Sequence, residues 1–319
     1  MGAFLRRRWF LILLLVGVVL ALLATEAVGA VLGPVPARWV VAGTLFLTAW
    51  GLESHRLWEA LTRPGPALTA VAVSYGLLPA LGLFTGTLFP LTDFRLGLLV
   101  AATVPCTLAS AAIWTRLAGG NEATALLVTI LTNSTSWLAT TAWLTLTTGA
   151  DVRLDPGRLM GDLILFLVLP IALGQLARGP TALRYAATRG KIALSVLARL
   201  LILLIILQAV VRAAEEVRGP RAGGSVGALA AVALACLGLH LAGLAAGLGG
   251  SRLLGFDRGS QIAVAFAGSQ KSLPIGLFVL NTYFAGYALA VVPMLFYHVG
   301  QLLVDTVIAD VFRGKDAKG

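Results

Sequence analysis

The stretch DRGSQIAVAFAGSQKSLPIGLFVLNTYF, residues 257–284, decides the fold of this chain. It is apolar enough to lie in lipid, yet Ser269, Gln270, Lys271 and Ser272 stand together near its middle. An ionisable side chain at the centre of a bilayer costs about 2.5 to 3.5 kcal/mol on insertion scales, so it marks a functional site that faces protein or water. We therefore predict that Lys271 points into the interior of a membrane protein.

A helix through this stretch is predicted to break beside the lysine. Pro274 and Gly276 follow Lys271 within two turns, and a proline removes one amide and clashes with the carbonyl four residues before it. The backbone groups that a break frees cannot stay unpaired in hydrocarbon. The break must then lie in a protein-lined cavity, which is how many secondary transporters build substrate and ion sites.

The composition fits this interpretation. Of 319 residues, 58% are hydrophobic and only 12% are charged, against about 25% charged in soluble proteins. Cys106 and Cys236 both fall in apolar segments, so neither a disulfide framework nor a cysteine metal site is indicated. The net charge of +10 is better explained by basic loops beside anionic lipid than by nucleic acid. The sequence predicts an all-α polytopic membrane protein.

Ten apolar runs of spanning length are bounded by charge, proline or glycine. They are Trp9–Thr25, Trp39–Ser54, Pro66–Phe89, Leu96–Arg116, Ala123–Thr148, Leu159–Ala177, Ile192–Val211, Val226–Gly249, Gln261–Phe284 and Ala288–Phe312. If the N-terminus is inside, the outer loops hold Arg38, Arg95, Arg153, Arg158, Arg212, Arg218 and Arg221, against fifteen basic residues on the cytoplasmic side. Basic residues accumulate inside, so both termini are predicted to be cytoplasmic, in a multi-pass protein of the plasma (inner) membrane.

Ten spans can divide into two repeats of five, residues 1–150 and 151–319, and an odd number of spans inverts the second repeat. The fourth and ninth spans, one in each repeat, are the most interrupted by proline and polar residues. In the fourth, Pro105 is followed by Thr107 and Ser110. This pairing predicts a binding site at the repeat interface. Taken alone, Pro105 could merely kink an ordinary helix.

Other polar residues carry weaker signals. Thr129 and Asn133 share one face of the fifth span, where they could line the site or simply bond between helices. His298 lies on one face of the tenth span with Gln301 and Asp305. A proton path through His298 and Asp305 and an ordinary buried histidine both remain open. His240 lies alone in a Gly, Ala and Leu helix, and no role is assigned to it.

Three segments resemble the bile acid:sodium symporter superfamily, and in particular its SBF-like branch of sodium bile acid cotransporters. They are TVPCTLASAAIWTRLAGGN at 103–121, FAGSQKSLPIGLFVLNTYF at 266–284 and VPMLFYHVGQ at 292–301. The resemblance implies two inverted five-helix repeats. Spans 1, 2, 6 and 7 would form a panel domain, spans 3–5 and 8–10 a core domain, and the broken helices 4 and 9 would cross. It also implies transport by alternating access.

The resemblance also implies a cation site built by the fourth, fifth and ninth helices of sodium-coupled members. Gln270 matches the family's ninth-helix glutamine, Ser110 a fourth-helix serine and Thr129 a fifth-helix threonine. The sequence departs from the family at the sodium-ligating glutamate, where Phe266 stands, with Lys271 nearby. That departure puts sodium coupling in doubt.

We therefore hypothesise that the Lys271 ammonium replaces the coupling cation and holds the crossing of the broken helices together through hydroxyl and carbonyl oxygens. Either proton exchange at this lysine or a permanent charge that binds the anionic substrate directly is compatible with the sequence. Sodium and proton stay open as coupling ions, with no other cofactor expected. The predicted substrate or ion site comprises Thr107, Ser110, Thr129, Asn133, Ser269, Gln270, Lys271, Ser272 and His298, with helix breaks at Pro105 and Pro274.

The predicted function is secondary active transport of a small organic anion of the bile-acid-like class. An arsenite-type carrier of the same superfamily is one alternative, because Cys106 beside the fourth-helix break could offer a soft thiolate. A non-transporting membrane sensor or regulatory protein is another. An enzyme is not expected, since Gly268-Ser269-Gln270 does not have the Gly-x-Ser-x-Gly form and no His-Glu-x-x-His pattern occurs, and no catalytic residue or resident metal is assigned.

Overall fold

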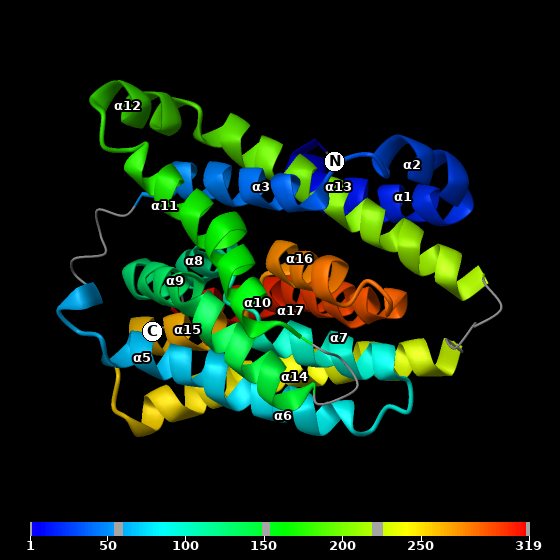
Figure 1. Ribbon diagram of the computed structural model, residues 1–319. Coiled ribbons are helices and arrows are strands. Elements are labelled where there is room, and N and C mark those ends of the chain that lie inside the picture. The colour runs from blue at the N-terminus through cyan, green and yellow to red at the C-terminus, as the bar shows by residue number, and fades with distance from the viewer. Residues whose placement is uncertain (1, 54–59, 149–153, 219–225, 317–319) are drawn as a thin grey trace.

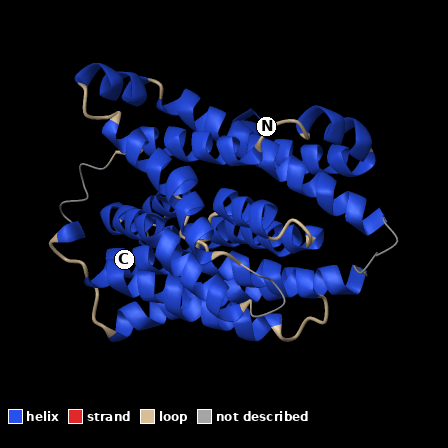
Figure 2. Cartoon of the chain, viewed as in Figure 1, coloured by secondary structure: helices blue, strands red, loops and turns tan. Residues whose placement is uncertain are grey.

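The computed structural model describes residues 2–53, 60–148, 154–218 and 226–316, and every regular element within these ranges is a helix (Figure 2). The first half holds α1 (Gly2–Leu23), α2 (Thr25–Leu32), α3 (Ala37–Gly51), α5 (Gly65–Ala72), η1 (Val73–Leu77), α6 (Leu78–Gly86), α7 (Thr92–Thr103), α8 (Ser110–Leu117) and α9 (Glu122–Thr147). The second half holds α10 (Pro156–Leu163), η3 (Ile164–Val168), α11 (Leu169–Leu176), α12 (Thr181–Arg189), α13 (Lys191–Arg218), α14 (Val226–Leu253), α15 (Arg258–Ser269), α16 (Leu273–Tyr283), η4 (Ala288–Ala290) and α17 (Val291–Asp316).

Six helical stretches of the described residues are long and apolar enough to cross a membrane. They are Gly65–Gly86, Pro156–Leu176, Lys191–Glu215, Val226–Leu253, Arg258–Tyr283 and Ala288–Arg313. The pair Ile12–Leu23 and Thr25–Leu32 adds a seventh if a helix bent by 110° is one span. These stretches and the exposed apolar side chains indicate a multi-pass membrane protein. The number of ten spans stays a prediction.

The other predicted spans are shorter or more polar than a simple membrane helix. Helix α3 has 15 residues, which at 1.5 Å per residue is about 22 Å, less than the hydrocarbon core. The fourth span is divided between α7 and α8, of 12 and 8 residues. Helix α9 is long enough, with 26 residues, but it is rich in threonine and serine. These helices can lie at membrane depth only where neighbouring protein covers them.

Two helices have no counterpart among the predicted spans. Helix α2 follows the sharp bend at Ala24, and α12 lies in the basic segment between the predicted sixth and seventh spans. Both are short, at 8 and 9 residues. Hydropathy over a window of spanning length cannot detect elements of this size, which explains why both were missed.

The helices form two layers (Figure 1). In the upper layer of that view α13 packs against α1, α2 and α3, and α11 packs against α3. In the lower layer α14 packs against α15 and α17, while α6 packs against α7. The assignment of these layers to panel and core domains stays a prediction, and the proposed repeat boundary at residues 150 and 151 lies outside the described residues.

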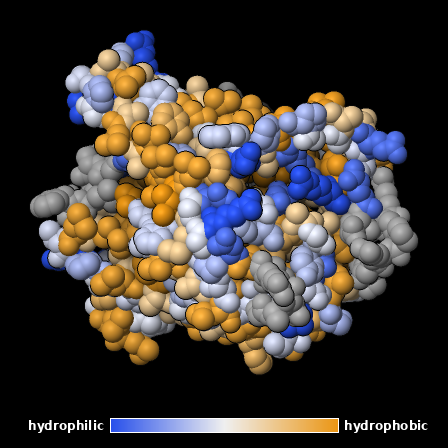
Figure 3. All heavy atoms as spheres, viewed as in Figure 1, coloured by the Kyte–Doolittle hydropathy of each residue, from blue (hydrophilic) through white to orange (hydrophobic). Residues whose placement is uncertain are grey.

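Apolar side chains cover much of the molecular face seen in Figure 3, where hydrophilic residues gather near the middle and at the corner occupied by α12. Large apolar residues are strongly exposed on several helices, with Leu146 at 82%, Val226 at 85% and Leu253 at 90% of their surface. A soluble protein rarely exposes so many contiguous apolar side chains. Contact with lipid explains them without a further partner.

Candidate functional site

The ninth predicted span is broken at residues 270–272. Helix α15 ends at Ser269, and Gln270 turns the chain into an extended conformation with φ −71° and ψ 142°. Helix α16 begins at Leu273, with Pro274 as its second residue, where the missing amide would have been unpaired anyway. Residues 262–280 are all buried. The break therefore lies inside protein and not against acyl chains.

The fourth predicted span is broken at residues 104–109. Helix α7 ends at Thr103, Val104 is extended with φ −67° and ψ 156°, and Pro105 follows it. Helix α8 then begins at Ser110. The first amides of such a short helix need partners, and the Thr107 hydroxyl accepts the Ala111 amide at 3.1 Å. Both prolines thus lie at the helix interruptions that the sequence predicted.

The two breaks contact each other through the backbone. The Ser272 amide donates to the Pro105 carbonyl at 2.9 Å, although 167 residues separate them along the chain. Each break has lost its regular intrahelical pairing at this point, so each supplies what the other lacks. The bond fixes where the broken helices cross.

The Lys271 side chain spans the crossing and is fully buried. Its Nζ donates to the Ser74 carbonyl at 2.7 Å, to the Ser74 hydroxyl at 3.1 Å and to the Val104 carbonyl at 3.0 Å. The Tyr75 ring lies with its centroid 5.7 Å from the ammonium, within range of a cation–π interaction. An ammonium has three N–H donors, and all three have an oxygen within reach.

The Ser74 carbonyl is free to accept the lysine because the helix is irregular there. Residues Val73–Leu77 form a π turn, in which the Leu78 amide bonds the Val73 carbonyl, and Pro79 has no amide. Neither of the two amides that could serve Ser74 in an α or π turn is therefore available. The Tyr75 carbonyl, also left without its usual partner by Pro79, accepts Trp143 Nε1 at 2.7 Å.

Gln301 of α17 pairs with the backbone of Lys271 on both sides. Its Oε1 accepts the Lys271 amide at 2.9 Å, and its Nε2 donates to the Lys271 carbonyl at 3.0 Å. The same Nε2 lies 3.0 Å from His298 Nδ1. One side chain thus replaces the two helical hydrogen bonds that the break removes. His298 acts on the site through Gln301.

Gln270 connects the fourth span with the tenth. Its Oε1 accepts Thr107 Oγ1 at 2.6 Å and lies 2.9 Å from Ser110 Oγ, which is also 2.7 Å from Thr107 Oγ1. Its Nε2 donates to Asp305 Oδ2 at 2.6 Å. The amide is oriented with its oxygen toward the two hydroxyls and its nitrogen toward the carboxylate. Thr107, Ser110 and Gln270 therefore form one connected polar group.

Asp305 also pairs with His240, the histidine to which the sequence assigned no role. His240 Nε2 lies 2.9 Å from Asp305 Oδ1, and both side chains are fully buried. His240 Nδ1 lies 3.4 Å from the Ser269 carbonyl, which accepts the Tyr297 hydroxyl at 2.8 Å. The hydrogen-bond partner of His298 is Gln301, and a proton path through His298 and Asp305 stays a prediction. The missed signal was general: an ionisable residue within a span needs a buried partner.

Helix α9 supplies partners for the carbonyls of the fourth-span break. Asn133 Nδ2 donates to the Cys106 carbonyl at 2.9 Å, and Thr129 Oγ1 to the Thr107 carbonyl at 3.3 Å. Asn133 Oδ1 is buried and has no hydrogen-bond partner among the described residues. Thr129 and Asn133 thus line the break, as the shared helical face had suggested.

The two remaining predicted residues contribute through their backbone. The Ser269 hydroxyl donates to the Ala265 carbonyl of its own helix at 2.8 Å and does not reach across the crossing. Ser272 contributes the amide that bonds Pro105. Ser74, His240, Gln301 and Asp305 were not among the predicted site residues. Each of them is brought to the crossing only by the packing of another span.

Phe266, which the resemblance matches to a sodium-ligating glutamate, has no oxygen in its side chain. Phe266 is fully buried and stacks edge-on against Phe312, with ring centroids 6.1 Å apart. No group of three or more His, Cys, Asp or Glu residues that could hold a metal ion occurs in the described ranges. Apart from Asn133 Oδ1, the polar side chains named above at the crossing are paired within the protein.

Comparisons with known proteins agree with the resemblance. The model of the SBF-like CPA transporter family matches residues 8–314. The chain is 25% identical to sodium/bile acid cotransporter 7-B of Xenopus laevis, over 97% of this chain and 92% of that protein. It is 24% identical to sodium/bile acid cotransporter 7 of Mus musculus, over 97% and 93%. A protein named "Probable sodium/metabolite cotransporter BASS4, chloroplastic" of Arabidopsis thaliana is 31% identical over 69% and 53%.

Proposed function

The chain belongs to the SBF-like CPA transporter family, and we propose that it is a secondary active transporter that moves a small organic anion by alternating access. The names of its relatives describe cotransporters of bile acid and of metabolites with sodium. These names support a small organic anion of the bile-acid-like class as the transported solute. The bilayer and this solute are the partners that we propose.

The observation that carries the proposal is the buried crossing of two broken helices. Secondary transporters of this general design bind their cargo near the bilayer midplane, where discontinuous helices leave backbone groups free. In this chain the breaks at 104–109 and 270–272 meet through Ser272 and Pro105, entirely within protein. This supports ten spans in two inverted five-helix repeats, with helices 4 and 9 crossing in a core domain that moves against a panel domain.

Within this scheme Lys271 replaces the coupling sodium. Its ammonium lies among two carbonyl oxygens and one hydroxyl, which is the kind of ligand set that a sodium ion would otherwise need. The family's glutamate is missing at Phe266. The carboxylate that contacts the site, Asp305, already holds His240 and Gln270 with its two oxygens. A sodium ion would have to displace one of these partners and approach a fixed positive charge.

Direct binding of the anionic substrate by Lys271 fits the geometry less well. All three donors of the ammonium are used within the protein, and its side chain has no exposed surface. Substrate recognition by the other polar residues of the crossing is the simpler arrangement. The proposed substrate or ion site keeps Thr107, Ser110, Thr129, Asn133, Ser269, Gln270, Lys271, Ser272 and His298, and gains Ser74, His240, Gln301 and Asp305.

The excess of basic residues on one side of the predicted spans supports the plasma (inner) membrane as the location, with both termini in the cytoplasm. No observation favours an arsenite-type carrier. Cys106 is fully buried at the fourth-span break, but the described residues place no cluster of thiols, histidines or carboxylates around it. A non-transporting sensor is likewise favoured by no specific contact, and the distinction is a matter for flux measurements.

Uptake into liposomes tests the proposal. Organic anions are first screened for ligand-induced stabilisation of the purified wild type and of Lys271→Ala, and those that bind are then followed into liposomes under imposed gradients. We expect uptake that needs no sodium, and acceleration by a pH gradient would identify the proton as the coupling ion. A strict sodium requirement would remove the role given to Lys271 but leave the transporter. Binding without flux would favour a sensor.

A further inference from the structure

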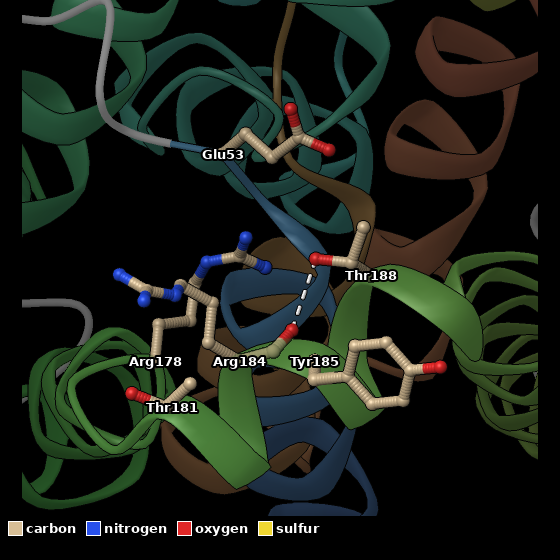
Figure 4. A pocket seen from close by; sticks show the side chains of 6 residues that line it. All are labelled: Glu53, Arg178, Thr181, Arg184, Tyr185 and Thr188. Carbon is tan, nitrogen blue, oxygen red and sulfur yellow. Dashed lines mark hydrogen bonds between the residues drawn. The ribbon is translucent and has the colours of Figure 1, made fainter.

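A polar hollow lies beside α12, at the residues that follow α3 and α11. It has a volume of about 380 Å³ and is lined by Glu53, Arg178, Thr181, Arg184, Tyr185 and Thr188 (Figure 4). Four of these residues belong to α12 or its N-terminal end, Arg178 follows α11, and Glu53 follows α3. We refer to these six residues as the α12 hollow.

The ends of three neighbouring helical segments place this hollow at one surface of the bilayer. Helix α3 ends at Gly51, the span Pro156–Leu176 ends two residues before Arg178, and α13 begins at Lys191. The helix ends next to these polar residues carry exposed apolar side chains, with Leu176 at the end of α11 71% exposed and Ile192 at the start of α13 81% exposed. The hollow is therefore polar at the height where the spans end and apolar just beside it, which is the profile of the interface between headgroups and acyl chains.

The charges around the hollow are unbalanced. Arg178, Arg184, Arg189 and Lys191 surround a single carboxylate, Glu53, which already pairs with Lys191 at 3.2 Å. Figure 4 shows the guanidinium groups of Arg178 and Arg184 extending into the same space. Like charges so close repel each other unless an anion lies between them.

The two arginines differ in how they are held. Arg178 Nη1 donates to the Trp50 carbonyl at 2.8 Å, which anchors one guanidinium group. The Arg184 guanidinium has no hydrogen bond or ion pair within the described residues, so its donors are available to a ligand. Arg189 donates to the Tyr185 hydroxyl at 2.9 Å and so keeps that ring beside the hollow. The anchored Arg178 guanidinium and the Arg184 guanidinium with unused N–H donors together suit a phosphate group, because phosphate accepts bidentate hydrogen bonds from arginine.

We propose that the α12 hollow binds the headgroup phosphate of an anionic phospholipid. The Arg178 and Arg184 guanidinium groups hold the phosphate, and the acyl chains run along the exposed Leu176 and Ile192. Basic pockets at the ends of transmembrane helices bind anionic lipid headgroups in this manner. The lipid would link α12 to the end of α3. This inference does not depend on which solute the protein carries.

Lipid-dependent thermal stability tests the proposal. The full chain is purified in neutral detergent, and its unfolding temperature is measured with dioleoyl phosphatidylglycerol, with dioleoyl phosphatidylcholine and with soluble glycerol phosphate. We expect the anionic lipid to raise the unfolding temperature of the wild type by several degrees over the neutral lipid. Arg184→Gln should lose at least half of that shift. Arg95→Gln, an exposed arginine on α7, is the matched control and should keep it.

Four results would overturn the proposal. Equal shifts in wild type and Arg184→Gln would mean that the lipid binds elsewhere. Equal stabilisation by the neutral lipid would mean that headgroup charge is irrelevant, and equal stabilisation by glycerol phosphate would mean a site for small soluble anions. Salt at 1 M shortens the Debye screening length to about 3 Å, so the lipid-induced shift in the unfolding temperature of the wild type should shrink in high salt. An unchanged shift would contradict recognition by charge.

Discussion

The two helix breaks of this protein solve the same problem with different chemistry. The break at 270–272 is three residues long and brings a charge, Lys271, into the crossing. The break at 104–109 is six residues long and contributes only carbonyls and hydroxyls, among them the Val104 carbonyl that accepts the lysine. Hydrogen bonds run in both directions, since the shorter break donates the Lys271 ammonium and the Ser272 amide, and its Gln270 Oε1 accepts the Thr107 hydroxyl of the longer break. The two breaks therefore form a single structural unit, because each depends on hydrogen bonds from the other.

The partners of the two breaks differ as well. The shorter break depends on a few specific side chains, because Gln301 alone serves both the amide and the carbonyl of Lys271. The longer break spreads its bonds over α9, where Asn133, Thr129 and Thr140 each serve one carbonyl. Substitutions at the shorter break should therefore cost more stability than substitutions around the longer one.

Lys271→Met should show the largest effect. The substitution keeps an unbranched stem but leaves two carbonyls and a hydroxyl without a donor, at about 1 to 3 kcal/mol for each group. Part of this is recovered because an ammonium is no longer buried. We expect the free energy of unfolding to fall by about 3 kcal/mol, measured by thermal or denaturant unfolding in detergent.

Lys191→Met is the matched control for this measurement. Lys191 pairs with Glu53 on the surface, with both side chains substantially exposed, and such pairs contribute at most about 1 kcal/mol. Equal losses in the two variants would mean that the bonds of Lys271 do not hold the crossing together.

Gln301→Leu should follow. Leucine fills most of the space but cannot pair with the backbone of Lys271, so one buried amide and one buried carbonyl lose their partners. We expect a loss of about 2 kcal/mol in the free energy of unfolding. Gln301→Glu, which keeps the acceptor and removes the donor, should fall between wild type and Gln301→Leu. No change in Gln301→Leu would show that water can replace this side chain.

Asn133→Leu at the longer break should cost less. It removes the two bonds that Nδ2 donates, to the Cys106 carbonyl at 2.9 Å and to the Thr129 carbonyl at 2.8 Å, but it also removes the Asn133 Oδ1 atom, which is buried without a partner among the described residues. The two terms oppose each other, and we expect a loss of about 1 kcal/mol. If unfolding measurements gave a larger loss for Asn133→Leu than for Gln301→Leu, the ranking of the two breaks would be reversed.

Asp257, at the start of α15, offers the smallest effect. Its carboxylate caps the helix by accepting the Ser260 amide at 3.0 Å and the Ser260 hydroxyl at 2.6 Å, and the hydroxyl bond holds the pKa of Asp257 below its usual range. Because the folded-state pKa is the lower one, this stabilisation is present above the ordinary aspartate pKa and is lost as the pH falls through the folded-state value.

Asp257→Asn keeps a good cap, so the free energy of unfolding at neutral pH should change by only a few tenths of a kcal/mol. When the free energy of unfolding is measured between pH 3 and pH 7, it should fall less steeply with decreasing pH in Asp257→Asn than in the wild type, roughly below pH 4. Asp310→Asn, on the exposed end of α17, is the control. An unchanged acid limb in Asp257→Asn would show that the cap does not contribute to the pH dependence.

Local signals in the sequence predicted the parts of the site that depend on neighbours along the chain. Pro105 and Pro274 predicted the two breaks, and the cost of a buried charge predicted that Lys271 would face protein. The partners of Lys271 could not be predicted in the same way. Ser74 accepts the lysine because a π turn and Pro79 free its carbonyl, 197 residues away in sequence. His240 and Asp305 are each unremarkable within their own helices, and only their meeting defines the pair.

The sequence by itself determined that this chain is helical, lies in a membrane and carries a charge inside a span that must break. It did so because apolar runs, prolines and a mid-span lysine act over one or two helical turns. The tertiary structure alone decided which oxygen each donor finds, that Gln301 bridges the shorter break, and that α12 encloses a basic hollow. Hydrogen bonds need their partners within about 3 Å, and only the packing of distant helices sets such distances.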